Sequence, residues 1–189
     1  MAVSNCMANL RVCIDPGHGM SNRSPGKYDP GACAHGLSEA DIVLQWALTC
    51  KWVLNNAGIF VYLTRDDDRD NTPVGSRDDM AERQNCTHFI SLHCNAGGGT
   101  GCETYYRDDA DKALATIVQN ALLSATGLKS RGLKTEDQSQ HSRLAVLDFN
   151  GPACLAETGF IDKAHDAKKL VDRDVRIRFA EGLRDGLLK

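Results

Sequence analysis

Two histidines and two glutamates in this sequence follow predicted strands or open a predicted helix. His18 comes shortly after the first apolar run, His93 ends the third, and Glu157 ends the last. Glu39 lies in the first turn of the helix that follows a long Gly- and Pro-rich loop. In an α/β sheet, catalytic and binding residues usually lie at the carboxyl ends of the strands. We therefore expect these four side chains to meet at one edge of the sheet.

That set of residue types matches a catalytic zinc site. Such sites use two histidines and a carboxylate as protein ligands, leave a fourth position open for water, and have a general base nearby. His18, Glu39 and His93 would be the ligands, and Glu157 the base. Neither HExxH nor a short HxxE pattern is present, so spacing alone is a weak signal. Glu39 also has a structural interpretation, because an acid in the first turn favours the helix dipole.

Other polar residues near these positions are candidates for supporting roles. We expect Asp15 to orient the His18 loop or to bond to a ligand rather than to bind metal itself. Asn95 is expected either to orient a ligand or to hydrogen-bond the substrate, and His141 is a candidate for lining the substrate groove. The remaining histidines are interpreted as surface or loop-packing residues: His35, His88 and His165.

The elements that must position these residues are apolar runs alternating with helical patterns. This alternation predicts an α/β fold with three layers, in which helices flank a mainly parallel, twisted sheet of about six strands. The predicted strands are 10–14, 59–63, 88–93, 102–106, 144–147 and 152–157, and the predicted helices are 38–56, 74–86, 109–126, 163–171 and 173–187. Two segments are predicted as loops beside the site, 15–36 and 132–143.

Composition excludes several classes of partner. The 189 residues carry a net charge of -3 with a pI near 6.0, so no basic face for nucleic acid is expected. The hydrophobic content of 42% is ordinary for a globular protein and predicts no membrane insertion. No repeat or linker divides the chain, so we expect one domain over 1–189, with a core of about 10–188, and a monomer.

The N-terminus and the cysteines indicate where the protein is made. MAVSNCMANLRVCID has no basic segment followed by a long apolar one, so no secretory signal is predicted. Eight cysteines are scattered without a CxxC pair, which favours free, buried thiols in a reducing cytoplasm. A thiol nucleophile at Cys94 or Cys33 remains an alternative to zinc.

Five motifs add a resemblance to a known family. In order and spacing, the chain resembles the zinc-dependent N-acetylmuramoyl-L-alanine amidases of type 3 through IDPGHG (14–19), GLSEADI (36–42), LTRD (63–66), ISLHCNA (90–96) and LAETGFID (155–162). The resemblance implies one Zn²⁺ per chain, bound by His18, Glu39 and His93. It also implies that Glu157 is the catalytic glutamate. Arg65 and Arg77 match basic positions of the family and are equally well explained as structural ion-pair partners.

The resemblance implies hydrolysis of the amide between N-acetylmuramic acid and L-alanine of peptidoglycan. Zinc lowers the pKa of its bound water toward about 7, and Glu157 would carry the proton to the leaving amine. Without a predicted signal, we expect an endolysin of a phage or prophage, made in the host cytoplasm, that acts on the wall in the periplasm after release. A bacterial wall-remodelling amidase, a thiol-dependent wall peptidase and a non-catalytic peptidoglycan-binding module are the alternatives.

The connection after His93 predicts an open site. Some members of the family carry an inserted helix that blocks the metal, whereas only AGGGTG (96–101) joins the two predicted strands here. Access to the metal should therefore be unobstructed. Because side chains alternate along a strand, His93 and Cys94 should face opposite ways.

Overall fold

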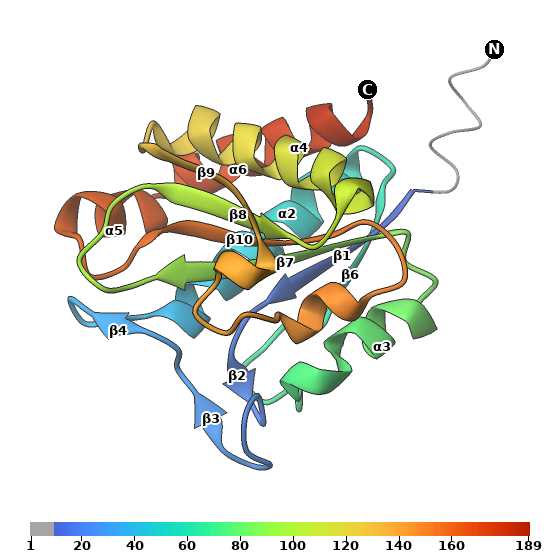
Figure 1. Cartoon of the computed structure of the whole chain (residues 1–189), viewed down its shortest axis with the longest axis horizontal. Coiled ribbons are helices and arrows are strands. Elements are labelled where there is room, and N and C mark those ends of the chain that lie inside the picture. Colours follow the sequence, from blue (N-terminus) through green and yellow to red (C-terminus); the bar gives the residue numbers. More distant parts are fainter. Residues whose placement is uncertain (1–9) are drawn as a thin grey trace.

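The computed structural model describes residues 10–189 and is built around a six-stranded sheet (Figure 1). The strands lie in the order β6-β1-β7-β10-β8-β9. Neighbouring strands are parallel throughout, except that β8 and β10 are antiparallel. Their bounds are β1 Arg11–Pro16, β6 Phe60–Leu63, β7 His88–Asn95, β8 Cys102–Tyr106, β9 Ser130–Thr135 and β10 Ala153–Phe160. The predicted α/β fold with a mainly parallel sheet is confirmed.

Helices cover the two faces of the sheet unequally (Figure 1). Three long helices pack on one face, and a short α-helix with a 3₁₀ segment, α3 and η3, covers part of the other. The helix bounds are α2 Glu39–Asn56, α3 Arg77–Arg83, α4 Asp109–Thr126, α5 Ala164–Leu170 and α6 Arg173–Leu187, with 3₁₀ segments η1 Val74–Ser76, η2 Glu136–Gln138 and η3 Ala145–Asp148. The larger apolar cluster lies under α2, α4 and α6, where the Trp46 indole N–H donates to the carbonyl oxygen of Leu170 at 2.8 Å.

Alternation along the central strands assigns their side chains to the two faces. Ile90, Leu92 and Cys94 of β7 belong to the cluster under the long helices, while Phe89 belongs to the smaller cluster under η3. A strand covered on both faces reads as a continuous apolar run, which explains why β7 was predictable. The polar residues at its end, His93 and Asn95, therefore share the face of Phe89.

The helix α2 begins with a side-chain cap. Ser38 is the N-cap, and its hydroxyl accepts a hydrogen bond from the backbone N–H of Asp41 at 3.3 Å. This bond satisfies one of the free N–H groups of the first turn. The cap fixes where Glu39 enters the fold.

Two predictions about elements were wrong, and both lie close to the site. The run 144–147 is not a strand, because Ala145–Asp148 forms η3 and buries Val146 and Leu147 in the smaller cluster. A run of four apolar residues has too little length to separate the two periodicities. The sixth strand is instead β9, within and before the predicted polar loop 132–143. As an edge strand it is partly exposed and polar, so it lacks the apolar alternation that marks a strand.

The predicted loop 15–36 and the two residues after it form two small hairpins, drawn in blue at the bottom and the lower left of Figure 1. They are built from β2 Gly19–Met20 with β3 Tyr28–Asp29, and from β4 Cys33–Ala34 with β5 Leu37–Ser38. The predicted helix 74–86 begins as η1 and continues as α3. The two hairpins carry the chain from β1 to α2 along one wall of the site.

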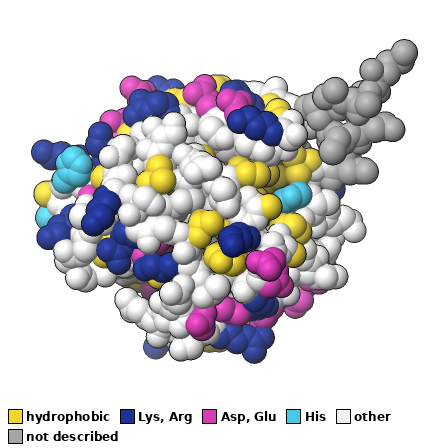
Figure 2. Space-filling view, turned by 45° about the horizontal axis from the view of Figure 1, so that its top comes forward, with side chains coloured by type: hydrophobic (Ala, Val, Ile, Leu, Met, Phe, Trp, Pro, Cys, Tyr) yellow, Lys and Arg dark blue, Asp and Glu magenta, His cyan; other side chains and the backbone are white. Residues whose placement is uncertain are grey.

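The surface carries charges of both signs, and the cysteines within residues 10–189 are free thiols. Basic and acidic side chains are interspersed on the face shown in Figure 2. Within residues 10–189, no helix has the length and hydropathy to cross a membrane. The seven cysteines in the described part of the chain are free thiols, and five of them are buried: Cys13, Cys50, Cys94, Cys102 and Cys154. Cys6 and the predicted absence of a signal segment fall in residues 1–9, outside the described part of the chain.

Candidate active site

A cavity of about 680 Å³ lies at the carboxyl ends of β1, β7 and β10. It opens on the face of the sheet that α3 and η3 cover only in part. His93 and Glu157 are direct partners in the register of β7 and β10, and both line this cavity together with His18 and Glu39. The structure thus brings together the four residues expected at this edge.

His18, Glu39 and His93 form a compact set of metal-ligating atoms. One ligand atom from each lies within 4.8 Å of the others. Glu39 Oε1 is 3.1 Å from His18 Nε2 and 2.9 Å from His93 Nδ1. Donor atoms of a tetrahedral zinc site are about 3.3 Å apart, given bonds of about 2.0 to 2.1 Å. The donor types and their separations therefore fit zinc.

Backbone groups hold the Glu39 carboxylate in place. Oε1 accepts a hydrogen bond from the Cys94 N–H at 2.8 Å, and Oε2 accepts one from the Ala32 N–H at 2.9 Å. Burial raises the pKa of Glu39, but hydrogen bonds to His18 and His93 outweigh it, so its pKa lies well below the usual range. The Glu39 side chain is therefore an ionised group that points at two imidazoles. An acid that only stabilised the helix dipole would not need this arrangement.

His18 occupies a strained position that its neighbours enforce. Its φ of 62° lies in the left-handed region, which a non-glycine residue adopts at a cost. Its carbonyl oxygen accepts from Arg77 Nη2 at 2.6 Å, and its Nδ1 lies 3.1 Å from Asp29 Oδ2. Burial lowers the pKa of His18, but the bonds to Glu39 and Asp29 raise it by more. Nδ1 is thereby engaged, and Nε2 is left to face Glu39.

Asp29 is a site residue that the sequence reasoning missed. Its Oδ1 accepts from the Gly31 N–H at 3.0 Å and its Oδ2 from Asn22 Nδ2 at 2.6 Å. Burial raises the pKa of Asp29, yet these bonds and the His18 contact lower it to about 2. A signal existed, because Asp-Pro-Gly is typical of a turn in which the Asp side chain bonds the N–H two residues on. A partner of this kind fixes the orientation of a ligating histidine.

Asp15 and the two arginines lie beneath the His18 loop. Asp15 is fully buried and accepts from Arg77 Nη1 and Ser91 Oγ, both at 2.6 Å, and from Thr64 Oγ1 at 2.5 Å. Arg65 donates to the carbonyl oxygens of Pro16, Gly17 and Ala40 at 2.8 to 3.0 Å. The arginines are therefore structural clamps on the backbone that carries His18, and Asp15 anchors one of them.

Two glycines permit the close packing around the ligands. A Cβ at Gly17 would lie 2.2 Å from Cε1 of His93. A Cβ at Gly31, whose φ is +67°, would lie 2.6 Å from Glu39 Oε2 and 2.8 Å from His18 Cδ2. No other residue fits these places without displacing a ligand.

Glu157 differs from the other acids of the site. Among the described residues its Oε2 atom is buried and has no hydrogen-bond partner. Burial raises the pKa of Glu157, and repulsion from Glu39 and Glu103 raises it further. A carboxylate left bare beside three ligand atoms suits a proton carrier.

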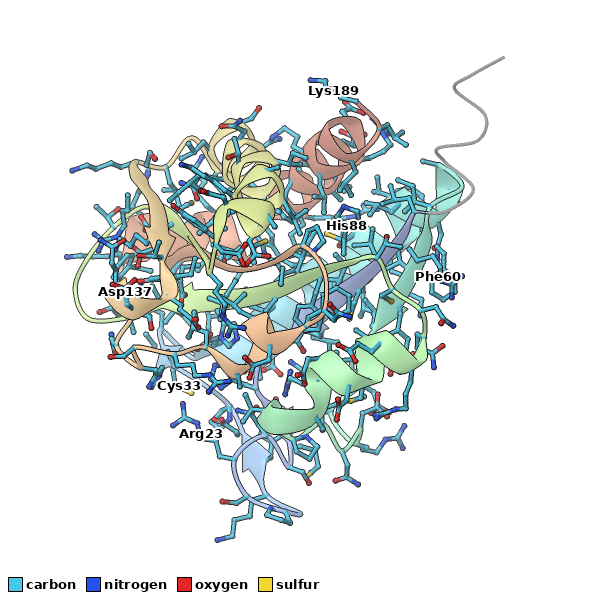
Figure 3. All side chains as sticks on the ribbon, turned by 45° about the vertical axis from the view of Figure 1, so that its right-hand side comes forward. Arg23, Cys33, Phe60, His88, Asp137 and Lys189 are labelled. Carbon is cyan, nitrogen blue, oxygen red and sulfur yellow. The ribbon has the colours of Figure 1, made fainter. Side chains whose placement is uncertain are left out.

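The secondary candidates separate into those at the cavity and those away from it. Asn95 and His141 line the cavity, the latter from the loop between β9 and η3. His35 Nε2 contacts the Asp162 carbonyl oxygen at 3.2 Å, and His165 lies in α5. His88 begins β7 and lies at the opposite end of the sheet from Arg23 and Cys33 (Figure 3).

The position of Cys94 argues against a thiol nucleophile. Its side chain is 4% exposed and packs in the cluster under the long helices, on the opposite face from His93. Burial raises its pKa well above the usual value, which disfavours the reactive thiolate. Cys33 is exposed and does not line the cavity.

Comparison with known proteins assigns the chain to a family. The profile of the N-acetylmuramoyl-L-alanine amidases called Amidase_3 matches residues 12–189. The chain belongs to this family. The expected enzyme class, N-acetylmuramoyl-L-alanine amidase, is thereby confirmed.

Curated relatives of the amidase include bacterial and phage proteins. It is 33% identical over 183 residues to the sporulation-specific N-acetylmuramoyl-L-alanine amidase of Bacillus subtilis, covering 94% of this chain and 67% of the relative. It is also 33% identical over 189 residues to the endolysin of Bacillus phage SPP1, covering 93% of this chain and 64% of that endolysin.

Solved structures share the fold of the amidase. The catalytic domain of CwlV from Bacillus (Paenibacillus) polymyxa var. colistinus superimposes with a TM-score of 0.80 at 31% identity, covering 94% of this chain and 95% of that one. The amidase AmiC2 of Nostoc punctiforme also gives a TM-score of 0.80, at 32% identity, covering 95% and 96%.

Proposed function

We propose that residues 1–189 form one catalytic domain that hydrolyses the amide between N-acetylmuramic acid and L-alanine of peptidoglycan, with one zinc ion bound by His18, Glu39 and His93. The observation that carries the proposal is the grouping of three ligand atoms within 4.8 Å in a cavity that Glu157 also lines. The Glu157 Oε2 atom has no hydrogen-bond partner in the described part of the chain. When bound, zinc supplies a Lewis acid that lowers the pKa of water and polarises the amide carbonyl.

The residues of the chain supply orientation and proton transfer. Asp29 engages His18 Nδ1 and so presents Nε2 to the metal. Glu157 takes a proton from the attacking water as oxygen bonds to the lactyl carbonyl carbon. It then delivers that proton to the alanine nitrogen as the C–N bond breaks, and the products are a carboxylate and an amine. His93 keeps 20% of its side chain exposed, in line with the open site expected from the short 96–101 loop.

Replacing the carboxylate of Glu157 tests the mechanism. Glu157→Gln should lower turnover by about 10² to 10⁴-fold while zinc content stays at one per chain, because no proposed ligand is changed. Mass spectrometry of digested sacculi identifies the bond cut, and elemental analysis measures zinc. Glu181→Gln, an exposed glutamate on α6, is the matched control. Near-normal activity of Glu157→Gln would refute its role.

Inhibitors separate zinc chemistry from thiol chemistry. EDTA should abolish release of stem peptide and iodoacetamide should leave it unchanged, because Cys94 is buried. Loss of activity to iodoacetamide alone would favour the thiol-dependent alternative instead. Binding of zinc without release of stem peptide would favour the non-catalytic binding module.

We further propose that the monomeric enzyme acts in lysis, as an endolysin. The similarity to the SPP1 endolysin supports this setting, and the similarity to bacterial wall amidases supports wall remodelling equally. Added to outer-membrane-permeabilised cells, an endolysin clears a suspension within minutes. Slow trimming of stem peptides without clearing would identify a remodelling enzyme.

A further inference from the structure

The buried carboxylate of Glu103 lies on the strand next to Glu157. The two are directly opposite in the antiparallel register of β8 and β10, and Glu157 is in turn opposite His93 on β7. Side chains at paired positions share a face of the sheet and lie about 5 Å apart. His93, Glu157 and Glu103 thus form a row across three strands on the cavity face.

Both carboxylate oxygens of Glu103 accept hydrogen bonds, unlike those of Glu157. It is 1% exposed, and its Oε2 accepts from Arg131 Nε at 2.7 Å and from Lys134 Nζ at 2.5 Å. Its Oε1 accepts from the Tyr105 hydroxyl at 2.9 Å and from Asn95 Nδ2 at 2.8 Å. Two cations hold this group ionised in a buried place, so it acts as a fixed acceptor.

A fixed acceptor decides which way the Asn95 amide points. A carboxylate only accepts hydrogen bonds, so the NH₂ of Asn95 must face Glu103. The Asn95 Oδ1 atom accepts from the Ala96 N–H at 2.9 Å, which holds the other end. Among residues 10–189, Glu103 is the only acceptor of Nδ2. Since Asn95 lines the cavity, one N–H remains for a ligand.

We propose that Glu103 is a positioning residue for the amidase reaction, which fixes Asn95 so that its second Nδ2 hydrogen donates to a carbonyl oxygen of the bound stem peptide. The proposal rests on the function proposed above. Asn95 is two residues beyond His93 on the same face of β7, so the donor lies next to the site of cleavage. The carbonyl oxygen of a peptide amide is an uncharged hydrogen-bond acceptor, which suits a single N–H donor.

A double-mutant cycle tests the coupling. With a soluble N-acetylmuramoyl-L-alanyl peptide as substrate, Asn95→Ala and Glu103→Gln should each lower kcat/KM about tenfold, the equivalent of one hydrogen bond. In the Asn95→Ala background, Glu103→Gln should have little further effect, because the residues act as a unit. Asp111→Asn, which removes a buried carboxylate from α4 outside the cavity, is the control and should leave kcat/KM of the folded protein unchanged.

Exchanging the amide and the carboxylate between positions 95 and 103 distinguishes a positioning role of Glu103 from a purely structural one. Asn95→Asp with Glu103→Gln keeps one hydrogen bond and the total charge of the pair, but removes the donor offered to the substrate. The swapped variant should keep the zinc content of the wild type and should melt no lower than Glu103→Gln alone, because both variants lack the carboxylate that pairs with Arg131 and Lys134. Its kcat/KM should be as low as that of Asn95→Ala. Recovery of wild-type kcat/KM, or additive losses in the cycle, would overturn the role of Glu103. A wild-type protein that releases no stem peptide would instead overturn the proposed function itself.

Discussion

At the scale of single residues, the site is built from acids in contrasting states. Asp15 forms an ion pair with Arg77, whereas the Oε2 atom of Glu157 has no hydrogen-bond partner among residues 10–189. Buried charges of the first kind hold backbone in place, and groups of the second kind move protons. The sequence analysis predicted Glu157 as the residue that moves a proton. It did not decide between a structural role and a substrate role for Arg77.

The Asp15–Arg77 pair should make stability depend on pH. Burial raises the pKa of Asp15, but Arg77, Ser91 and Thr64 lower it by more, so its folded-state pKa is below its unfolded value. Stability from this group is therefore present above about pH 4 and is lost as pH falls through the folded-state pKa. Asp15→Asn should lose about 3 to 5 kcal/mol at pH 7 because Arg77 stays buried without its partner.

Urea unfolding at several pH values checks this prediction. The gap between wild type and Asp15→Asn should narrow as the pH is lowered below about 4. Asp67→Asn, at an exposed pair with Arg69, is the control and should match the wild type throughout. A gap that is constant with pH would contradict the ionised pair.

A second prediction at the residue scale compares two glycines with the same backbone conformation. Gly31 and Gly26 have φ of +67° and +68°, but a Cβ meets Glu39 and His18 only at Gly31. Gly26→Ala should cost about 1 kcal/mol of stability from backbone strain with unchanged zinc affinity. Gly31→Ala should weaken zinc binding by at least tenfold, measured by competition with a chromophoric chelator. Equal zinc affinity in the two variants would contradict the ligand role of Glu39.

At the scale of elements, η3 replaces the strand predicted at 144–147. It lays Val146 and Leu147 on the smaller cluster, and the polar loop before it reaches the cavity through His141. The site is open because this face of the sheet is covered by short elements rather than by long helices.

Shortening the Leu147 side chain tests whether η3 is packed firmly in the core. Leu147 is 2% exposed, so Leu147→Ala should lower the free energy of unfolding by about 2 to 5 kcal/mol. The control is Val171→Ala, because Val171 is 45% exposed and its change should be small. Thermal denaturation followed by circular dichroism measures both, and a small effect at Leu147 would show that η3 is loosely attached.

At the scale of the whole molecule, the proposed metal joins three distant segments. His18 follows β1, Glu39 opens α2 and His93 lies near the end of β7, so a ligand that binds only the folded chain should stabilise all of them. Zinc at about 1,000 times its Kd should add about 4 kcal/mol. The melting temperature should rise with zinc and fall with EDTA, and His93→Ala should abolish both shifts. An unchanged melting temperature in the wild type would count against a zinc site.

The sequence by itself determined the fold class, the central strands and the residues at their carboxyl ends. Buried parallel strands are continuous apolar runs, and polar residues at or shortly after the end of a run lie at the sheet edge. This pattern placed His18, His93 and Glu157 at that edge, while the resemblance to the family supplied their expected roles. Only the tertiary structure decided what holds them. Asp15 meets Arg77 across 62 positions, and Glu103 meets Lys134 across 31. The edge strand β9 and the Asp29 contact to His18 also emerged only there, because such contacts depend on how elements pack and leave no periodic trace in the chain.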